Sequence, residues 1–132
     1  MVSPSDAWAA GFSITPSQDI QPHFLHWNGS AWAVVSSPHL SSTYNILQSI
    51  VAVSGNLVWA AGSRSVNGHV VTFVERWDGA RWRIELTPSL QGGGSYLDGL
   101  SVDPGGGLWA VGYFYPHDFS GFRTLILHRS LG

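Results

Sequence analysis

Apolar residues in this chain fall into short patterns that are typical of β-strands. From Arg81 to Leu86, large apolar side chains alternate with charged ones, which is the period of two expected for a strand with one buried face. We therefore expect Trp82, Ile84 and Leu86 to share a buried face. The run Ile50–Val53 is apolar at every position, as in a strand buried on both faces. No segment shows a helical period, so the pattern predicts an all-β fold.

The middle of the chain contains four such segments. The expected strands span Ser49–Ser54, Leu57–Ser63, Val70–Trp77 and Arg81–Leu86. The connections Ser54–Asn56 and Trp77–Ala80 are short and contain glycine, which suits tight hairpin turns. We therefore expect a unit of four antiparallel strands here.

This pattern recurs along the chain. A Trp-Ala motif that ends in glycine occurs at Trp8–Gly11, Trp59–Gly62 and Trp109–Gly112, in steps of 51 and 50 residues. The segment Trp27–Trp32 recurs 50 residues later as Trp77–Trp82. A repeat of about 50 residues built from short strands has the size of a propeller blade. The sequence therefore predicts β-propeller blades of four antiparallel strands, about three per chain, with repeats at approximately 1–47, 48–97 and 98–132.

The first and last copies are incomplete. Val2 aligns with the end of an inner strand at Val53 and Val102, so the first copy lacks most of its first strand. The third copy ends near Arg129, where the other copies turn into a fourth strand. We therefore expect ten strands, in groups of three, four and three. Because open sheet edges favour self-association, we also expect identical chains to close a head-to-tail ring, as a six-blade homodimer or a nine-blade homotrimer.

These motifs resemble those of a known group. The W-A-V-G sequence at Trp109–Gly112 and the W-N-G-x-x-W sequence at Trp27–Trp32 resemble the tryptophan-rich propeller repeats of bacterial proteins, and the resemblance covers nearly the whole chain. More distantly, the chain is similar to the Asp-box propellers of sialidase-like proteins and photosystem assembly factors. Trp27 or Trp77 stands where those proteins have the box aspartate. The resemblance implies a propeller turn geometry and not sialidase catalysis, whose arginine cluster and nucleophilic tyrosine have no assignable counterpart.

The composition narrows the range of partners. Charged residues make up 11% of the chain, against roughly 25% in an average domain. The net charge is -2 and no basic run occurs, so nucleic acid, which needs clustered Lys and Arg, is not an expected partner. No apolar stretch is long enough to span a bilayer, so no membrane partner is expected. The chain has no cysteine, which excludes disulfides and thiolate metal sites.

All seven tryptophans belong to the repeated motifs. They form three sets of corresponding positions: Trp8, Trp59 and Trp109; Trp27 and Trp77; Trp32 and Trp82. Because residues used alike in every copy usually serve packing between sheets, we expect a structural role for all of them. The alternative is a lectin in which the indole faces form repeated sugar-binding pockets, which requires at least one set to be exposed.

The variable loops are the expected location of a binding surface. In an up-and-down sheet, the connections between second and third strands lie at the same end as those between units. These connections differ in length between copies, and variable loops on a rigid scaffold commonly carry function. Their Tyr, Asn and His content suits adaptable recognition of a glycan or protein ligand. The candidate ligand-binding residues are Tyr44, Asn45, Arg64, His69, Tyr96, Tyr113, Tyr115, His117 and Asp118.

No pattern favours catalysis or metal binding. His23 and His26 are three residues apart, which places them on opposite faces of a strand. His117 and Asp118 lack an accompanying nucleophile, and the glycine-rich segments 92–94 and 104–107 lack the lysine and helix of a phosphate-binding loop. We therefore expect a non-catalytic binding module without cofactor or metal. A sialidase-like or lyase-like enzyme fragment is the disfavoured alternative.

Overall fold

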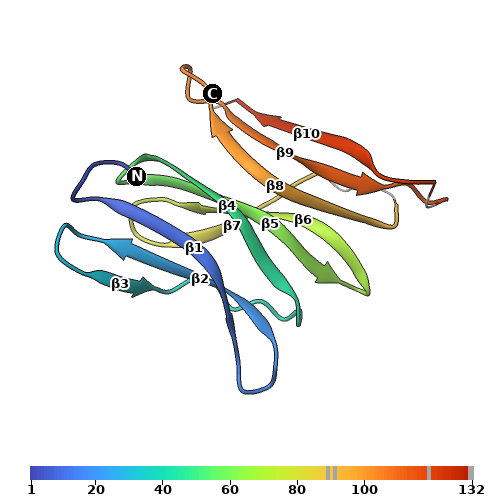
Figure 1. The fold of residues 1–132 in the computed structure, drawn as a ribbon, viewed down its shortest axis with the longest axis horizontal. Coiled ribbons are helices and arrows are strands. Elements are labelled where there is room, and N and C mark those ends of the chain that lie inside the picture. Colours follow the sequence, from blue (N-terminus) through green and yellow to red (C-terminus); the bar gives the residue numbers. More distant parts are fainter. Residues whose placement is uncertain (89, 91, 119, 131–132) are drawn as a thin grey trace.

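The chain consists of β-strands and their connections. The computed structural model describes residues 1–88, 90, 92–118 and 120–130, and no helix occurs in these ranges (Figure 1). The strands are β1 (Ala7–Ile14), β2 (Ile20–Trp27), β3 (Trp32–Val35), β4 (Asn45–Ser54), β5 (Leu57–Val66), β6 (His69–Trp77), β7 (Trp82–Glu85), β8 (Gly94–Val102), β9 (Leu108–Tyr115) and β10 (Arg123–Arg129). The predicted all-β class is confirmed.

The strands form three separate antiparallel sheets. The first sheet has the order β1-β2-β3, the second β4-β5-β6-β7 and the third β8-β9-β10. Figure 1 shows the second sheet lying between the other two. The grouping into three, four and three strands matches the expectation from the incomplete first and last copies.

The cross-strand register places corresponding residues of the sequence repeat at corresponding points of the three sheets. Each tryptophan of the Trp-Ala motif lies opposite a basic residue of the next strand: Trp8 opposite His26, Trp59 opposite Arg76 and Trp109 opposite His128. Residues at the same register point are called equivalent below. This equivalence allows the environment of one sheet to be compared directly with that of another.

Two hydrophobic cores lie between the sheets. The first core, between the first and second sheets, contains Trp8, Phe24, Leu40, Leu47, Val58, Ala60, Phe73 and Trp82. The second core, between the second and third sheets, contains Trp59, Ala61, Val74, Leu97, Leu108, Ala110 and Leu125. The second sheet is therefore covered on both faces, whereas each terminal sheet is covered on one.

The glycine of the Trp-Ala motif faces a bulge in the inner strand. In the second sheet, Gln48 is an extra residue beside the pair that contains Gly62, and Asp98 is the extra residue beside Gly112 in the third sheet. A Cβ atom on either glycine would overlap a carbonyl oxygen of the inner strand. Gly11, the equivalent residue of the first sheet, has no such neighbour, because that sheet has no inner strand in the described ranges.

The expected buried face of the outer strand is wrong beyond its first residue. Trp82 is buried, but Ile84 is partly exposed and Leu86, which follows β7, is 98% exposed. Both residues line an open cavity of about 190 Å³ beside β6.

The inner strand is also less buried than expected. Ile50–Val53 was predicted to be buried on both faces, yet Ile50, Val51 and Ala52 are only half-buried and Val53 is exposed. The reason is that β4 is an edge strand of the second sheet. One long side of it therefore faces no neighbouring strand of that sheet.

The connection between β5 and β6 is shorter than expected. Val66 pairs with His69, so only Asn67 and Gly68 form the turn. Asn67 has a φ of 51° and Gly68 a φ of 79°, as a type I′ hairpin requires. The segment from Arg64 to His69 is therefore a tight hairpin and not a long loop.

Candidate functional site

Three of the four tyrosines of the chain gather at one end of the third sheet. Tyr96 in β8 lies opposite Tyr113 in β9, and their rings stack with centroids 4.8 Å apart. Tyr115 lies edge-on to both, at centroid distances of 6.5 Å and 5.9 Å. Phe122, which is largely exposed, lies 6.0 Å from Tyr113. We call these residues together with Tyr44 the tyrosine surface.

Tyr44 and Asp98 influence the ionisation of this cluster. Burial raises the pKa of Tyr96, and the neighbouring phenols Tyr44 and Tyr115 raise it further. Burial likewise raises the pKa of Tyr113, with contributions from Asp98 and the other three tyrosines. Phenols with raised pKa values stay protonated at neutral pH, so they can donate hydrogen bonds to a ligand.

Other candidate residues do not join this surface. Asn45 is fully buried, and its amide donates to the carbonyl oxygens of Ile20 and Ser42 at 2.9 Å and 2.7 Å. The Cζ atom of Arg64 lies 5.8 Å from the ring centroid of Phe73, which belongs to the first core. Both side chains are thus engaged within the protein.

Three further candidates lie in exposed turns or directly beside one. His69 is exposed where the β5–β6 turn ends. His117 and Asp118 are exposed in the connection between β9 and β10. Asp118 accepts a hydrogen bond from the backbone nitrogen of Ser120 at 3.0 Å, and hydrogen bonding to Ser120 lowers the pKa of its carboxyl group. This carboxylate therefore stays charged at the protein surface.

The tryptophan positions differ in exposure between sheets. Trp59 is fully buried whereas its equivalent Trp109 is 41% exposed, and Trp82 is 2% exposed whereas its equivalent Trp32 is 49% exposed. The exposed members lie on the uncovered faces of the third and first sheets. Trp8 is buried in the first core.

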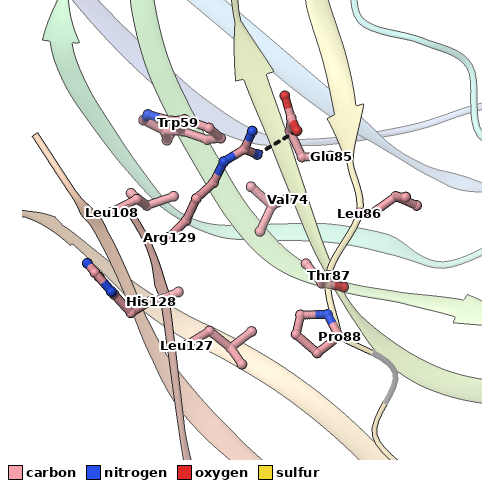
Figure 2. A pocket seen from close by; sticks show the side chains of 11 residues that line it. Trp59, Val74, Glu85, Leu86, Thr87, Pro88, Leu108, Leu127, His128 and Arg129 are labelled. Carbon is pink, nitrogen blue, oxygen red and sulfur yellow. Dashed lines mark hydrogen bonds and ion pairs between the residues drawn. The ribbon is translucent and has the colours of Figure 1, made fainter. Parts of the chain in front are cut away.

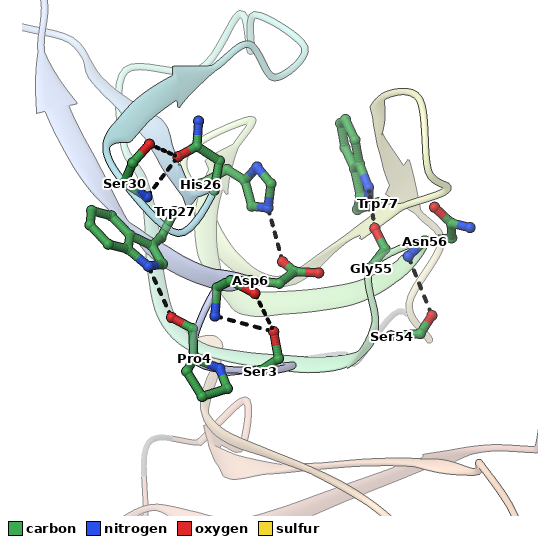
Figure 3. A network of polar contacts seen from close by, with 12 residues as sticks. Ser3, Pro4, Asp6, His26, Trp27, Ser30, Ser54, Gly55, Asn56 and Trp77 are labelled. Atoms are coloured by element: carbon green, nitrogen blue, oxygen red, sulfur yellow. Dashed lines mark hydrogen bonds and ion pairs between the residues drawn. The ribbon is translucent and has the colours of Figure 1, made fainter.

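The remaining tryptophan set shares a hydrogen bond to a turn. The indole nitrogen of Trp27 donates to the carbonyl oxygen of Pro4 at 3.1 Å, and that of Trp77 donates to Gly55 at 3.2 Å (Figure 3). Both tryptophans are half-buried. They fasten β2 and β6 to the turn that precedes the Trp-Ala strand of the same sheet.

Sequence reasoning missed a polar contact beside the Trp-Ala motif. His26 stacks on Trp8 with centroids 4.5 Å apart, and its Nε2 lies 2.9 Å from Oδ1 of Asp6 (Figure 3). In the third sheet, His128 stacks on Trp109 at 4.2 Å, and the Trp109 indole donates to Asp103 at 3.1 Å. An aspartate shortly before the motif tryptophan was the available sequence signal.

A cavity between the second and third sheets was not foreseen either. It has a volume of about 280 Å³. Its apolar wall consists of Trp59, Val74, Leu108, Ala110 and Leu127 (Figure 2). The wall combines residues that are far apart in the sequence, so no local sequence motif predicts the cavity.

An ion pair lies at the rim of this cavity. Arg129 donates from Nη1 to Glu85 Oε2 at 2.6 Å (Figure 2), and Arg76 donates to the other oxygen at 2.8 Å. The Arg129 guanidinium also lies over the Trp59 ring, 5.2 Å from its centroid. Burial opposes ionisation of Glu85, but hydrogen bonds from both arginines hold the pKa of its carboxyl group below the usual value.

Glu75 is a carboxyl group at a core position. It is fully buried, and neither of its oxygens has a hydrogen-bond partner among the described residues. Burial raises its pKa to about 8, with Arg64 acting in the opposite direction. The equivalent residues of the other sheets are Leu25 and Leu127. Glu75 therefore occupies an apolar position of the repeat and is mostly protonated at neutral pH.

Comparison of the sequence with protein-family models and with curated proteins finds no match in either. Within the described ranges, no group of three or more His, Asp or Glu residues is arranged to hold a metal ion. The part of the chain that the structure describes also has no helix long and apolar enough to cross a membrane.

Proposed function

We propose that the chain is a non-catalytic binding module of the β-propeller type, and that the tyrosine surface recognises its ligand. The observation that carries this proposal is the convergence of three tyrosines from β8 and β9, whose pKa values Tyr44 before β4 helps to raise at Tyr96 and Tyr113. Tyrosine offers a large flat face and a hydroxyl group at a low cost in conformational entropy. Such a cluster at the ends of strands, next to variable connections, suits recognition better than packing.

The packing of the sheets supports the propeller arrangement. Trp8 and Phe24 of the first sheet contact the second sheet, and their equivalents Trp59 and Val74 contact the third. The same packing arrangement between neighbouring sheets thus occurs twice in succession. Sheets that pack by one repeated arrangement can continue around an axis, as the blades of a propeller do.

Exposed residues on the terminal sheets support closure by identical chains. Trp109, Val111 and Ile126, equivalent to Trp59, Ala61 and Val74, are all exposed on the third sheet. Trp32 and Val34 are exposed on the first sheet. Trp32 of a second copy would cover Trp109 and Ile126 as Trp82 covers Trp8 and Phe24. Two chains would give a six-blade ring and three chains a nine-blade ring.

The proposed ligand surface and the proposed contact between copies both include residues of β9. Alternate residues of a strand share a face, so Tyr113 and Tyr115 lie on the same face as Trp109 and Val111. A second copy that covers Trp109 would therefore border the tyrosine surface. The ligand would bind next to the junction between copies.

Carbohydrate is the ligand class that we consider as the second candidate. The exposed carboxylate of Asp98 beside the phenols favours it, because sugars present both apolar faces and hydroxyl groups. A lectin with repeated indole pockets is not supported, since Trp59 and Trp82 are buried where such pockets would need them exposed.

An array of soluble oligosaccharides, followed by NMR titration with any hit, tests the recognition surface. We expect backbone shifts to cluster around Tyr96, Tyr113 and Tyr115. The double variant Tyr113→Ala/Tyr115→Ala should weaken binding at unchanged melting temperature. Light scattering of the variant separates loss of ligand from loss of association. Shifts confined to the short hairpin turns would contradict the proposed surface.

A further inference from the structure

A polar cavity lies between the segment that precedes β4 and the end of β5. It has a volume of about 430 Å³, which is within the range of sites for small ligands. Its polar lining residues are Ser41, Ser42, Thr43, Arg64, Ser65 and Asn67. Among the described residues that line it, Arg64 alone is charged. The cavity therefore combines hydroxyl and amide groups with one positive charge.

The charge of Arg64 is not neutralised within the protein. Three other arginines are paired with carboxylates, but no ion pair joins Arg64 to a carboxyl group in the described ranges. Its buried Nε atom also has no hydrogen-bond partner there. Arg64 influences the pKa of Glu75, but that carboxyl group is mostly protonated at neutral pH. The contact with the Phe73 ring uses no hydrogen-bond donor of the guanidinium, so its donors remain for an anionic group.

Arg64 is not part of the repeated scaffold. The cross-strand register makes it equivalent to Ser13 in the first sheet and to Phe114 in the third. The three sheets thus have a hydroxyl, a guanidinium and an aromatic ring at one position. A packing role common to the sheets does not account for the arginine.

Buried polar side chains fix the wall formed by residues 41–43. Gln21 is buried, donates to the carbonyl oxygen of Leu40 at 3.0 Å and accepts from the Leu40 backbone nitrogen at 3.1 Å. Gln21 and the fully buried Asn45 both donate to the carbonyl oxygen of Ser42, at 3.3 Å and 2.7 Å. The wall is therefore held in place before a ligand arrives, which lowers the entropic cost of binding.

We propose that this cavity binds a hydroxyl-rich small molecule that carries one carboxylate or phosphate group, such as an acidic sugar, with the anionic group on Arg64. Guanidinium groups form strong, charge-assisted hydrogen bonds with both anions. Ser41, Thr43 and Asn67 are exposed at the cavity. Their hydroxyl and amide groups can exchange hydrogen bonds with the hydroxyl groups of the ligand.

This site is separate from the proposed ligand surface. None of its six polar lining residues belongs to the tyrosine surface or to the exposed tryptophan faces of the terminal sheets. Binding here therefore requires neither ring closure nor the tyrosine surface. Its test can fail or succeed independently of both.

The test is an NMR titration with glucuronate, glucose 6-phosphate and glucose at constant ionic strength. The two acidic sugars should shift the backbone signals of Ser42, Thr43 and Ser65 and the side-chain Nε signal of Arg64. They should bind at least about tenfold more tightly than glucose, since hydrogen bonds to a charged group are the stronger ones. Tighter binding of glucuronate assigns a carboxylate ligand, and tighter binding of glucose 6-phosphate assigns a phosphate.

Protein variants check which groups hold the ligand. Arg64→Gln should weaken binding of both acidic sugars at least about tenfold. Arg81→Gln is the matched control, because it removes the same charge from an exposed arginine outside the cavity, and it should bind them normally. Thr43→Val, which keeps the shape of the side chain and removes its hydroxyl group, should weaken binding severalfold and serves if Arg64→Gln does not fold.

Four outcomes would overturn the proposal. They are equal binding of glucose and the acidic sugars, equal losses in Arg64→Gln and Arg81→Gln, shifts confined to residues away from the cavity, and no shifts with either acidic sugar at millimolar concentrations.

Discussion

Trp82 in β7 stacks face to face on Phe24 in β2, with ring centroids 3.8 Å apart and planes inclined by 13°. This contact joins two sheets through the outer strand of one and the middle strand of the other. The equivalent of Phe24 in the third sheet is Ile126, which is exposed, and the equivalent of Trp82 in the first sheet is Trp32, which is also exposed. The residues equivalent to this pair are thus left uncovered on the outer faces of the two terminal sheets.

The first prediction compares two equivalent tryptophans. Trp59→Ala should lower the free energy of unfolding by about 3 to 5 kcal/mol, because it removes a large, fully buried side chain from the second core. Trp109→Ala should cost about 1 kcal/mol or less within one chain, since the indole is already partly exposed. Urea unfolding at a protein concentration below that of any association measures both. Equal losses would contradict the assignment of the covered faces.

The second prediction concerns pH. Burial raises the pKa of Glu75 in the folded protein to about 8 from the ordinary glutamate value of 4.5, so the folded state binds the proton more tightly than the unfolded state. Its stabilising contribution is complete below pH 4.5 and is lost as pH rises through 8. The free energy of unfolding should therefore fall over this interval, by a total on the order of 4 kcal/mol.

Substitution at Glu75 tests this cause. Glu75→Leu, which introduces the residue found at the equivalent positions 25 and 127, should remove the pH dependence and raise stability at pH 8 by about 3 kcal/mol. Glu75→Gln is the matched control, which removes the titration but keeps a buried polar group. Chemical denaturation between pH 5 and 8 measures the effect. An unchanged slope in Glu75→Leu would show that another group titrates.

The third prediction concerns the glycine of the Trp-Ala motif. Gly62→Ala should destabilise by more than about 3 kcal/mol, because the new Cβ overlaps the backbone of the bulged inner strand. Gly11→Ala should be neutral or stabilising by up to about 1 kcal/mol, since nothing lies within 4 Å of its Cβ position and alanine restricts the unfolded chain. Thermal unfolding of the two variants measures the difference. Similar melting temperatures would contradict the role of the inner strand.

The period of the tryptophan motifs was sufficient to predict the strands and their grouping. Trp8, Trp59 and Trp109 recur at a nearly constant spacing. Short apolar segments separated by turn residues are compatible with few structures other than repeated antiparallel strands. The Asn67–Gly68 turn was also readable from the sequence, because this dipeptide is the strongest short-range hairpin signal. This turn was not predicted, because the length of the connection was taken from the alignment of the repeats. The turn preference of Asn67 and Gly68 was not considered.

The exposure of individual residues could not be predicted from the sequence. Trp59 and Trp109 stand in nearly the same local motif, yet one is buried and the other is not. Their difference depends on whether another sheet covers that face, which local pattern does not encode. The cavity beside Arg129 and the buried carboxyl group of Glu75 escaped prediction for the same reason.

The molar mass in solution tests the central claim, that identical chains continue the stack of sheets, most directly. Multi-angle light scattering at tens of micromolar should report two or three times 14.3 kDa. Trp109→Glu, which places a charge on the exposed face, should reduce the particle to a folded single chain. A monodisperse, folded particle of 14.3 kDa for the unmodified protein would contradict the account.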